Sequence, residues 1–194
     1  MTSDSSVIGR RATIKALALG SVAALATGAG VRTANAGGLP AGCVQEGWRW
    51  CHKCEGMFYG LASAGAGGMG VCPAGGTHDA TGSGHYYERA GTDIAGVQQG
   101  GWSWCNKCMI FFYSRASAGA GGMGHCPAGG AHSNALSTAY AAVLGEDATG
   151  QQGGWRWCRK CMGMFYARAS AGLGVCPTGG AHDPSASGHY ASLD

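Results

Sequence analysis

The 194-residue chain has little of what many soluble domains use to build helices or to bind polyanions. Only 12% of its residues are charged, and it has no long leucine-rich stretch with helical periodicity. Proline and phenylalanine are scarce, with 5 and 4 residues, whereas glycine is abundant with 38. This composition argues against a helical protein and favours short strands joined by glycine-rich loops.

The small excess of basic residues is confined to the first 36 positions. That segment holds four of the 13 Lys and Arg residues and one of the 10 Asp and Glu residues, so the remainder has nine of each. Residues 37–194 are neutral overall, so they lack the excess of basic side chains with which proteins bind nucleic acids and anionic membranes. We therefore expect no nucleic-acid partner and no binding to charged membranes.

Residues 1–36 have the pattern of an export signal. Arg10 and Arg11 precede a weakly apolar run, and residues 34–36 (Ala-Asn-Ala) offer a small-x-small cleavage site. Paired arginines before such a run resemble a twin-arginine signal, which exports proteins that have already folded. The run is too short and too poor in large apolar residues to predict a membrane span. We expect a secreted, extracellular chain that begins at Gly37.

One pattern occurs three times in the rest of the chain. Each copy reads Gln-x-Gly-Trp-x-Trp-Cys-x-Lys-Cys and, later, Cys-Pro-x-Gly-Gly-x-His. Copies of this length at even spacing indicate supersecondary units that stack or surround an axis. We expect residues 37–44 to form a linker and residues 45–194 to form one domain of three repeats, at approximately 45–96, 97–149 and 150–194.

Cys43 lies before the first repeat and has no counterpart in the other two. Residues 39–43 faintly resemble a lipoprotein cleavage box, but Pro40 stands where an aliphatic residue is expected. We therefore expect no lipid anchor at Cys43, and instead a free thiol or a partner in an intermolecular disulfide.

Each repeat supplies three thiols and one imidazole. The spacing is C-x2-C-x17-C-x5-H in the first two repeats and C-x2-C-x14-C-x5-H in the third, so only the loop between the two ligand pairs varies. Three cysteines and one histidine are typical of a closed, tetrahedral, structural zinc site. The predicted ligands are Cys51, Cys54, Cys72 and His78; Cys105, Cys108, Cys126 and His132; and Cys158, Cys161, Cys176 and His182.

We expect about three zinc ions per chain, one for each set of ligands. Disulfides are the first alternative, because an exported chain meets an oxidising compartment. Three cysteines cannot all form disulfides within one repeat, however, because three is an odd number. Disulfides would therefore have to pair the cysteines differently in repeats that are otherwise equivalent. Iron is the second alternative, because the Cys-Pro-x-Gly-Gly turn resembles part of a rubredoxin knuckle.

Four short strands are expected in each repeat. In the first repeat they are residues 48–50, 57–59, 71–72 and 85–89, and the C-x2-C turn joins the first two into a metal-holding hairpin. Four strands repeated three times predict an all-β, β-trefoil-like domain with pseudo-threefold symmetry. Three tandem zinc-ribbon-like units are the alternative. Whether the tryptophans of the Trp-x-Trp pairs are buried or exposed is left open.

The repeat is similar to that of a group of secreted bacterial proteins built from tandem Trp-x-Trp-Cys-x-Lys-Cys…Phe-Tyr…Cys-Pro-x-Gly-Gly-x-His…Tyr units. The likeness extends over residues 44–194. It implies the repeat organisation, and it implies no particular activity because none is established for that group.

The recurring aromatic and polar residues predict a binding module. Tyr86, Tyr140 and Tyr190 occupy equivalent positions, and Asp79 and Asp183 directly follow a predicted histidine ligand. Stacking with a few fixed hydrogen bonds suits a shallow sugar site. We therefore expect a zinc-stabilised extracellular module that binds carbohydrate or a cell-wall polymer; a structural or assembly protein of the cell surface is the alternative. No nucleophile–base pair recurs in the three copies, so we expect no enzyme.

Overall fold

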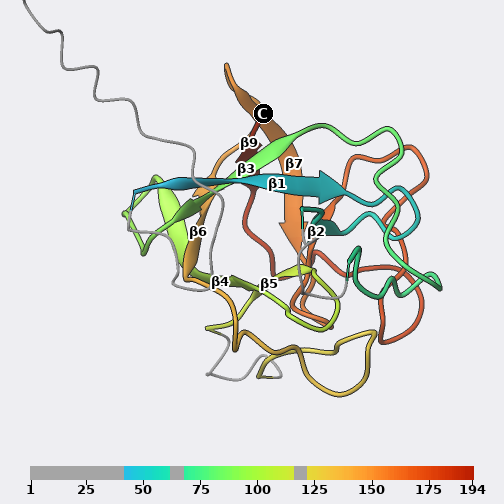
Figure 1. Cartoon of the computed structure of the whole chain (residues 1–194). Helices are drawn as coiled ribbons and strands as arrows, with labels where there is room; N and C mark the ends of the chain where they lie inside the picture. Colours follow the sequence, from blue (N-terminus) through green and yellow to red (C-terminus); the bar gives the residue numbers. More distant parts are fainter. Residues whose placement is uncertain (1–41, 62–67, 116–121) are drawn as a thin grey trace, which may run out of the picture.

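The computed structural model describes residues 42–61, 68–115 and 122–194, which contain nine β-strands and no helix (Figure 1). The all-β prediction is confirmed. In these three ranges, no helix has the length and hydrophobicity needed to span a bilayer. The predicted export signal, with Arg10 and Arg11, lies outside the described residues.

Each repeat contributes a long, a very short and a medium strand in that order. The strands are β1 (Val44–Trp50), β2 (Met57–Tyr59) and β3 (Tyr86–Ala90); β4 (Gln98–Trp104), β5 (Phe111–Tyr113) and β6 (Tyr140–Leu144); and β7 (Gln151–Trp157), β8 (Met164–Tyr166) and β9 (Tyr190–Leu193). The expected strand at residues 71–72 is wrong. The Cys72 N–H donates to the Gly76 carbonyl at 2.8 Å, so this segment belongs to a tight turn and not to the sheet.

The nine strands form one nearly closed antiparallel sheet. Within each repeat the long strand pairs with the other two, as β1 does with β2 and β3. Between repeats, β3, β6 and β9 pair with one another, and β2, β5 and β8 meet through single bridges. The three repeats therefore share a sheet, unlike independent ribbons on a string, while the trefoil assignment stays a prediction.

A β-bulge interrupts β1 at the glycine before the first tryptophan. The register shifts between Gln45 and Trp48, and Gly47 has a φ of +97°, which a residue with a side chain adopts only with strain. A bulge changes the direction in which the following side chain points. Trp48, the next residue, is completely buried.

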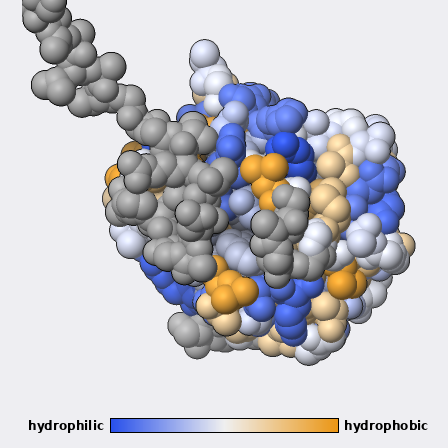
Figure 2. Space-filling view, viewed as in Figure 1, coloured by the Kyte–Doolittle hydropathy of each residue, from blue (hydrophilic) through white to orange (hydrophobic). Residues whose placement is uncertain are grey.

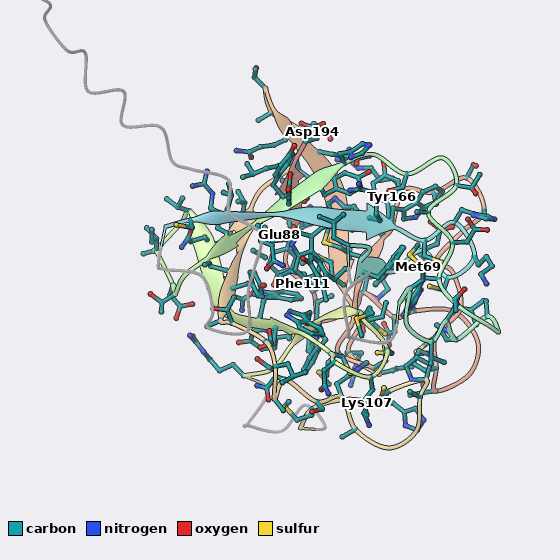
Figure 3. All side chains as sticks on the ribbon, viewed as in Figure 1. Met69, Glu88, Lys107, Phe111, Tyr166 and Asp194 are labelled. Atoms are coloured by element: carbon teal, nitrogen blue, oxygen red, sulfur yellow. The ribbon has the colours of Figure 1, made fainter. Side chains whose placement is uncertain are left out.

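Aromatic side chains fill the interior of the sheet. Phe111, in the core in Figure 3, stacks on Trp102 with ring centroids 5.1 Å apart and meets Trp48 edge-on at 4.8 Å. The first tryptophan of each Trp-x-Trp pair is buried, whereas the second is half-buried in two repeats, at Trp50 and Trp157. On the face drawn in Figure 2, hydrophobic residues accordingly form small patches among hydrophilic ones.

One carboxyl is buried where β3 meets β9. Glu88 accepts a hydrogen bond from the Ser192 hydroxyl at 2.7 Å, and the equivalent residue of the second repeat is Ala142. Burial raises the pKa of Glu88 to about 8, although the Ser192 hydrogen bond opposes the shift. Glu88 is therefore mostly protonated at neutral pH, which makes its place in an apolar interior less costly.

A polypeptide of residues 97–149, the second repeat alone, is expected not to fold even with zinc supplied. Its strand β6 would keep β4 but lose its other two partner strands, β3 and β9, and the apolar surface that it buries against them would be exposed to water. NMR should give a poorly dispersed spectrum and calorimetry no cooperative transition. The three-repeat domain is the positive control; a well-dispersed, cooperatively melting single repeat would contradict a shared fold.

Candidate metal centres

Two tight turns hold the ligands of each centre. In the first repeat, the turn between β1 and β2 brings Cys51 and Cys54 together, as predicted. The Glu55 N–H closes this turn by donating to the Cys51 carbonyl at 2.8 Å, with Glu55 at a φ of +63°. Cys72 and His78 flank the Pro-x-Gly-Gly turn. The loop of variable length lies between the two turns, so its length does not change the ligand geometry.

The four ligand atoms of each centre converge. They lie within 4.8 Å of one another, and all the side chains are buried. In the first repeat, the two sulfurs of Cys51 and Cys72 are 3.9 Å apart, and Cys54 Sγ is 3.5 Å from His78 Nδ1. A tetrahedral zinc with bonds to sulfur of about 2.3 Å separates two sulfurs by about 3.8 Å. The observed spacing therefore fits zinc.

The same distances exclude disulfides between these ligands. The cysteines are free thiols, and their closest sulfurs are 3.8 to 3.9 Å apart, against about 2.05 Å in a disulfide. The chain thus has three buried Cys3His groups, and the prediction of about three metal ions is confirmed. Thiolate and imidazole donors of this number and geometry match structural zinc.

Each histidine ligand is oriented by the next repeat. His78 presents Nδ1 to the sulfurs, while its Nε2–H donates to the carbonyl of Cys108 at 3.1 Å. The other two bonds join His132 to Cys161 and His182 to Cys54, at 3.1 and 3.2 Å. A proton held on Nε2 leaves Nδ1 free to bind metal. The three bonds close a ring that links every centre to the next.

The surroundings of each centre favour a cation. The backbone N–H of Asp79 donates to Cys51 Sγ at 3.4 Å, which stabilises the thiolate. Burial lowers the pKa of His132, but hydrogen bonds to the sulfurs of Cys105 and Cys126 outweigh it and raise the pKa to about 9. Sulfurs that hold a proton on the imidazole in this way would hold a zinc dication in its place.

The lysine of the Cys-x-Lys-Cys motif joins the two ligand turns, a role that sequence reasoning missed. Lys53 Nζ donates to the carbonyls of Gly75 and Thr77 at 2.8 and 2.6 Å. The equivalent bonds run from Lys107 to Gly129 and from Lys160 to Gly179 and Ala181. Figure 3 places Lys107 at the edge of the molecule. The lysine recurs in all three motifs, and this recurrence could have indicated its structural role from the sequence.

The three tyrosines predicted to bind sugar are buried, although Tyr86 and Tyr190 also line pockets between repeats, and their role in ligand binding stays a prediction. Tyr86, Tyr140 and Tyr190 are 5%, 0% and 4% exposed. Each meets a tryptophan of another repeat edge-on, with ring centroids 5.2 to 5.4 Å apart. Edge-on packing of buried aromatic rings is favourable, so these tyrosines help to hold neighbouring repeats together.

Hydrogen bonds also tie these tyrosines to the first residue of the repeated motif. The Tyr140 hydroxyl donates to Gln45 and the Tyr190 hydroxyl to Gln99, in each case across a junction between repeats. The motif glutamine therefore helps to align neighbouring repeats, which sequence reasoning did not foresee.

Asp79 and Asp183 lie half-buried beside the first and third centres. Asp79 Oδ1 accepts from the Thr81 N–H and Asp183 Oδ1 from the Ser185 N–H, both at 2.9 Å. Hydrogen bonds from the Thr81 side chain and N–H lower the pKa of Asp79, and those from the Ser185 N–H and side chain lower the pKa of Asp183. Both aspartates thus close the turn after a histidine ligand. Their role in ligand binding stays a prediction.

Two pockets at junctions between repeats have equivalent walls. The larger, of about 580 Å³, lies between repeats one and three, and the smaller, of about 450 Å³, between repeats three and two. Equivalent motif positions line them: Trp50, Tyr86, Gln152 and Tyr166 in the first, and Trp157, Tyr190, Gln99 and Tyr113 in the second. At the third junction, the equivalent Trp104 and Tyr59 are both buried, 5.9 Å apart.

Comparison of the chain with protein-family models, with curated proteins and with solved structures finds no match. A functional assignment therefore depends on the chemistry of the metal centres and of the two junction pockets.

Proposed function

We propose that the mature chain acts outside the cell as a zinc-stabilised, trefoil-like binding module, with a glycan as its ligand and no catalytic activity. The observation that carries this proposal is the pair of aromatic pockets at two equivalent junctions. Their repetition at the same motif positions supports a common ligand chemistry. Two pockets on one chain would also increase the avidity for a polymer with repeated units.

The walls of these pockets suit a sugar ring. Trp157 and Tyr113 have centroids 6.0 Å apart and an angle of 73° between their planes, so they form a corner of apolar surface. The amide of Gln99 lines the same pocket. Among the described residues the Trp157 indole N–H has no hydrogen-bond partner. A pyranose combines an apolar face with hydroxyls at its rim, which would meet the aromatic corner and the side chain of Gln99.

The metal would serve this function indirectly. Trp50 directly precedes Cys51, and Trp157 directly precedes Cys158. Each half-buried tryptophan is therefore the sequence neighbour of a metal ligand, and the position of its backbone depends on that ligand. Four protein ligands leave a tetrahedral zinc no open position for substrate. Zinc bound at these centres would therefore hold the turns that place the pocket walls.

Replacing Trp157 or Trp50 with alanine is expected to lower affinity for the bound polysaccharide about tenfold, because each change removes one stacking face. Binding should be measured first on glycan arrays and insoluble cell-wall polymers, then by calorimetry on the best ligand. Zinc content and melting temperature should stay near those of the parent chain.

Leu136→Ala, which truncates an exposed side chain, is the control and should bind as the parent does. Trp157→Phe should retain most of the affinity. If the folded, zinc-loaded chain is retained by no glycan surface, the proposal fails, and the alternative of a cell-surface assembly protein is favoured.

A further inference from the structure

The pocket between repeats one and three contains a carboxylate that the repetition of the chain does not account for. Glu55 follows the second cysteine of the first repeat, and the equivalent residues are Met109 and Met162. All three have the same backbone conformation, with φ between +63° and +66°. The backbone therefore does not demand a glutamate here, and the difference between repeats lies in the side chain.

The side chain of Glu55 is fixed in the pocket by a hydrogen bond to one of its two carboxylate oxygens. The residue is 1% exposed, and its Oε2 accepts the indole N–H of Trp50 at 2.7 Å. Its backbone carbonyl accepts the Tyr166 N–H at 2.8 Å, across the junction between repeats. Oε1 has no hydrogen-bond partner among the residues that the structure describes, and Glu55 lines the pocket. A nearly buried carboxylate is thus presented to a ligand.

The basic side chains around this pocket lie beside other carboxylates. Arg168 forms ion pairs with Asp147 and Glu146, and His52 lies 3.7 Å from Asp79. Glu55, in contrast, forms no ion pair among the described residues, and its side chain accepts a hydrogen bond from a neutral indole N–H. It is therefore the carboxyl group in this pocket that a cationic ligand could pair with.

The aromatic walls add to the attraction of a cation. Trp50 and Tyr166 both line the pocket, and Figure 3 shows Tyr166 near the end of β1, the strand that carries Trp50. Indole and phenol rings attract a cation placed over their faces, and the attraction grows when water is excluded. A carboxylate beside aromatic rings is a good complement to a protonated amine.

We propose that this pocket selects a sugar residue with a free ammonium group, such as a 2-amino-2-deoxyhexose, with the ammonium on Glu55 and the ring against Trp50. This inference rests on the proposed glycan function and names the ligand class of one of its two sites. The pocket beside Trp157 has methionine at the equivalent position and takes a neutral sugar residue. An N-acetylated sugar in the first pocket would leave Glu55 without a counter-charge.

The test is calorimetry of the zinc-loaded chain with glucosamine hexamer and N-acetylglucosamine hexamer. The parent chain should bind the glucosamine hexamer at least about tenfold more tightly, because a charge-assisted hydrogen bond is lost with the acetylated one. Glu55→Gln and Glu55→Met should each abolish this preference. Glu55→Met is also the control for folding, because methionine occupies the equivalent position in the other two repeats. Zinc content and melting temperature should be unchanged.

A converse variant transfers the site. Met162→Glu should provide an acceptor for the unpartnered indole N–H of Trp157 and create a second amine site, which would double the stoichiometry for short glucosamine oligomers. Binding of both hexamers with equal affinity, or a preference that survives in Glu55→Met, would overturn this inference and leave the glycan function standing. Binding of no glycan at all would remove the proposed function, and this inference with it.

Discussion

Removing zinc from the folded chain is expected to unfold all three repeats together. A structural Cys3His site contributes about 10–16 kcal/mol to folding in small zinc domains, and each site here holds the two turns of its own repeat. The centres are also joined, because each histidine ligand donates a hydrogen bond to a cysteine carbonyl of the next centre. Loss of one ion should therefore weaken the other two sites.

The measurement is a chelator titration followed by circular dichroism and native mass spectrometry. We expect one cooperative transition that releases about three ions, since each of the three ligand sets holds one. Cys126→Ser should remove one ion and raise the chelator sensitivity of the remaining two. The control is Leu136→Ala, a variant at an exposed residue outside the metal centres, which should release its metal as the parent chain does. Stepwise release with a native spectrum after the first ion would contradict this coupling.

Replacing Gly124 with alanine should destabilise the chain by several kcal/mol, on the order of 3–5. Gly124 has a φ of +67°, and a Cβ built on it would lie 2.2 Å from the carbonyl oxygen of Cys161. That oxygen also accepts the His132 hydrogen bond, and as a backbone atom beside a metal ligand it cannot easily move. The methyl group would therefore push the second repeat away from the third centre.

Gly129→Ala is the matched control. Gly129 also has a positive φ, of +98°, but a Cβ there meets no atom within 4 Å, so only backbone strain of about 1–2 kcal/mol is expected. Urea unfolding at saturating zinc should separate the two variants by about 1–4 kcal/mol, the share of the effect that comes from the clash. Equal losses would show that the close approach at Gly124 is relieved at little cost.

The metal ligands were predictable because their geometry is local. Cys51 and Cys54 lie in one turn, and Cys72 and His78 flank another, so fixed spacing was enough to identify both pairs. The hairpin around the first pair was predicted for the same reason. The predicted strand at residues 71–72 was wrong, because the hydrogen bonds of this segment close within the turn. The burial of the repeated tyrosines could not be predicted from the sequence.

The sequence by itself determined the three ligand sets and the all-β class, since each depends on the spacing and alternation of nearby residues. Only the tertiary structure decided which aromatic residues are core and which line a pocket. Trp104 of the second repeat is buried against Tyr59, whereas the equivalent Trp50 and Trp157 each line a pocket. Such contacts join residues of different repeats that are far apart in the sequence, and the repeats must pack before the burial of each side chain, the ring of histidine hydrogen bonds and the place of Glu55 are defined.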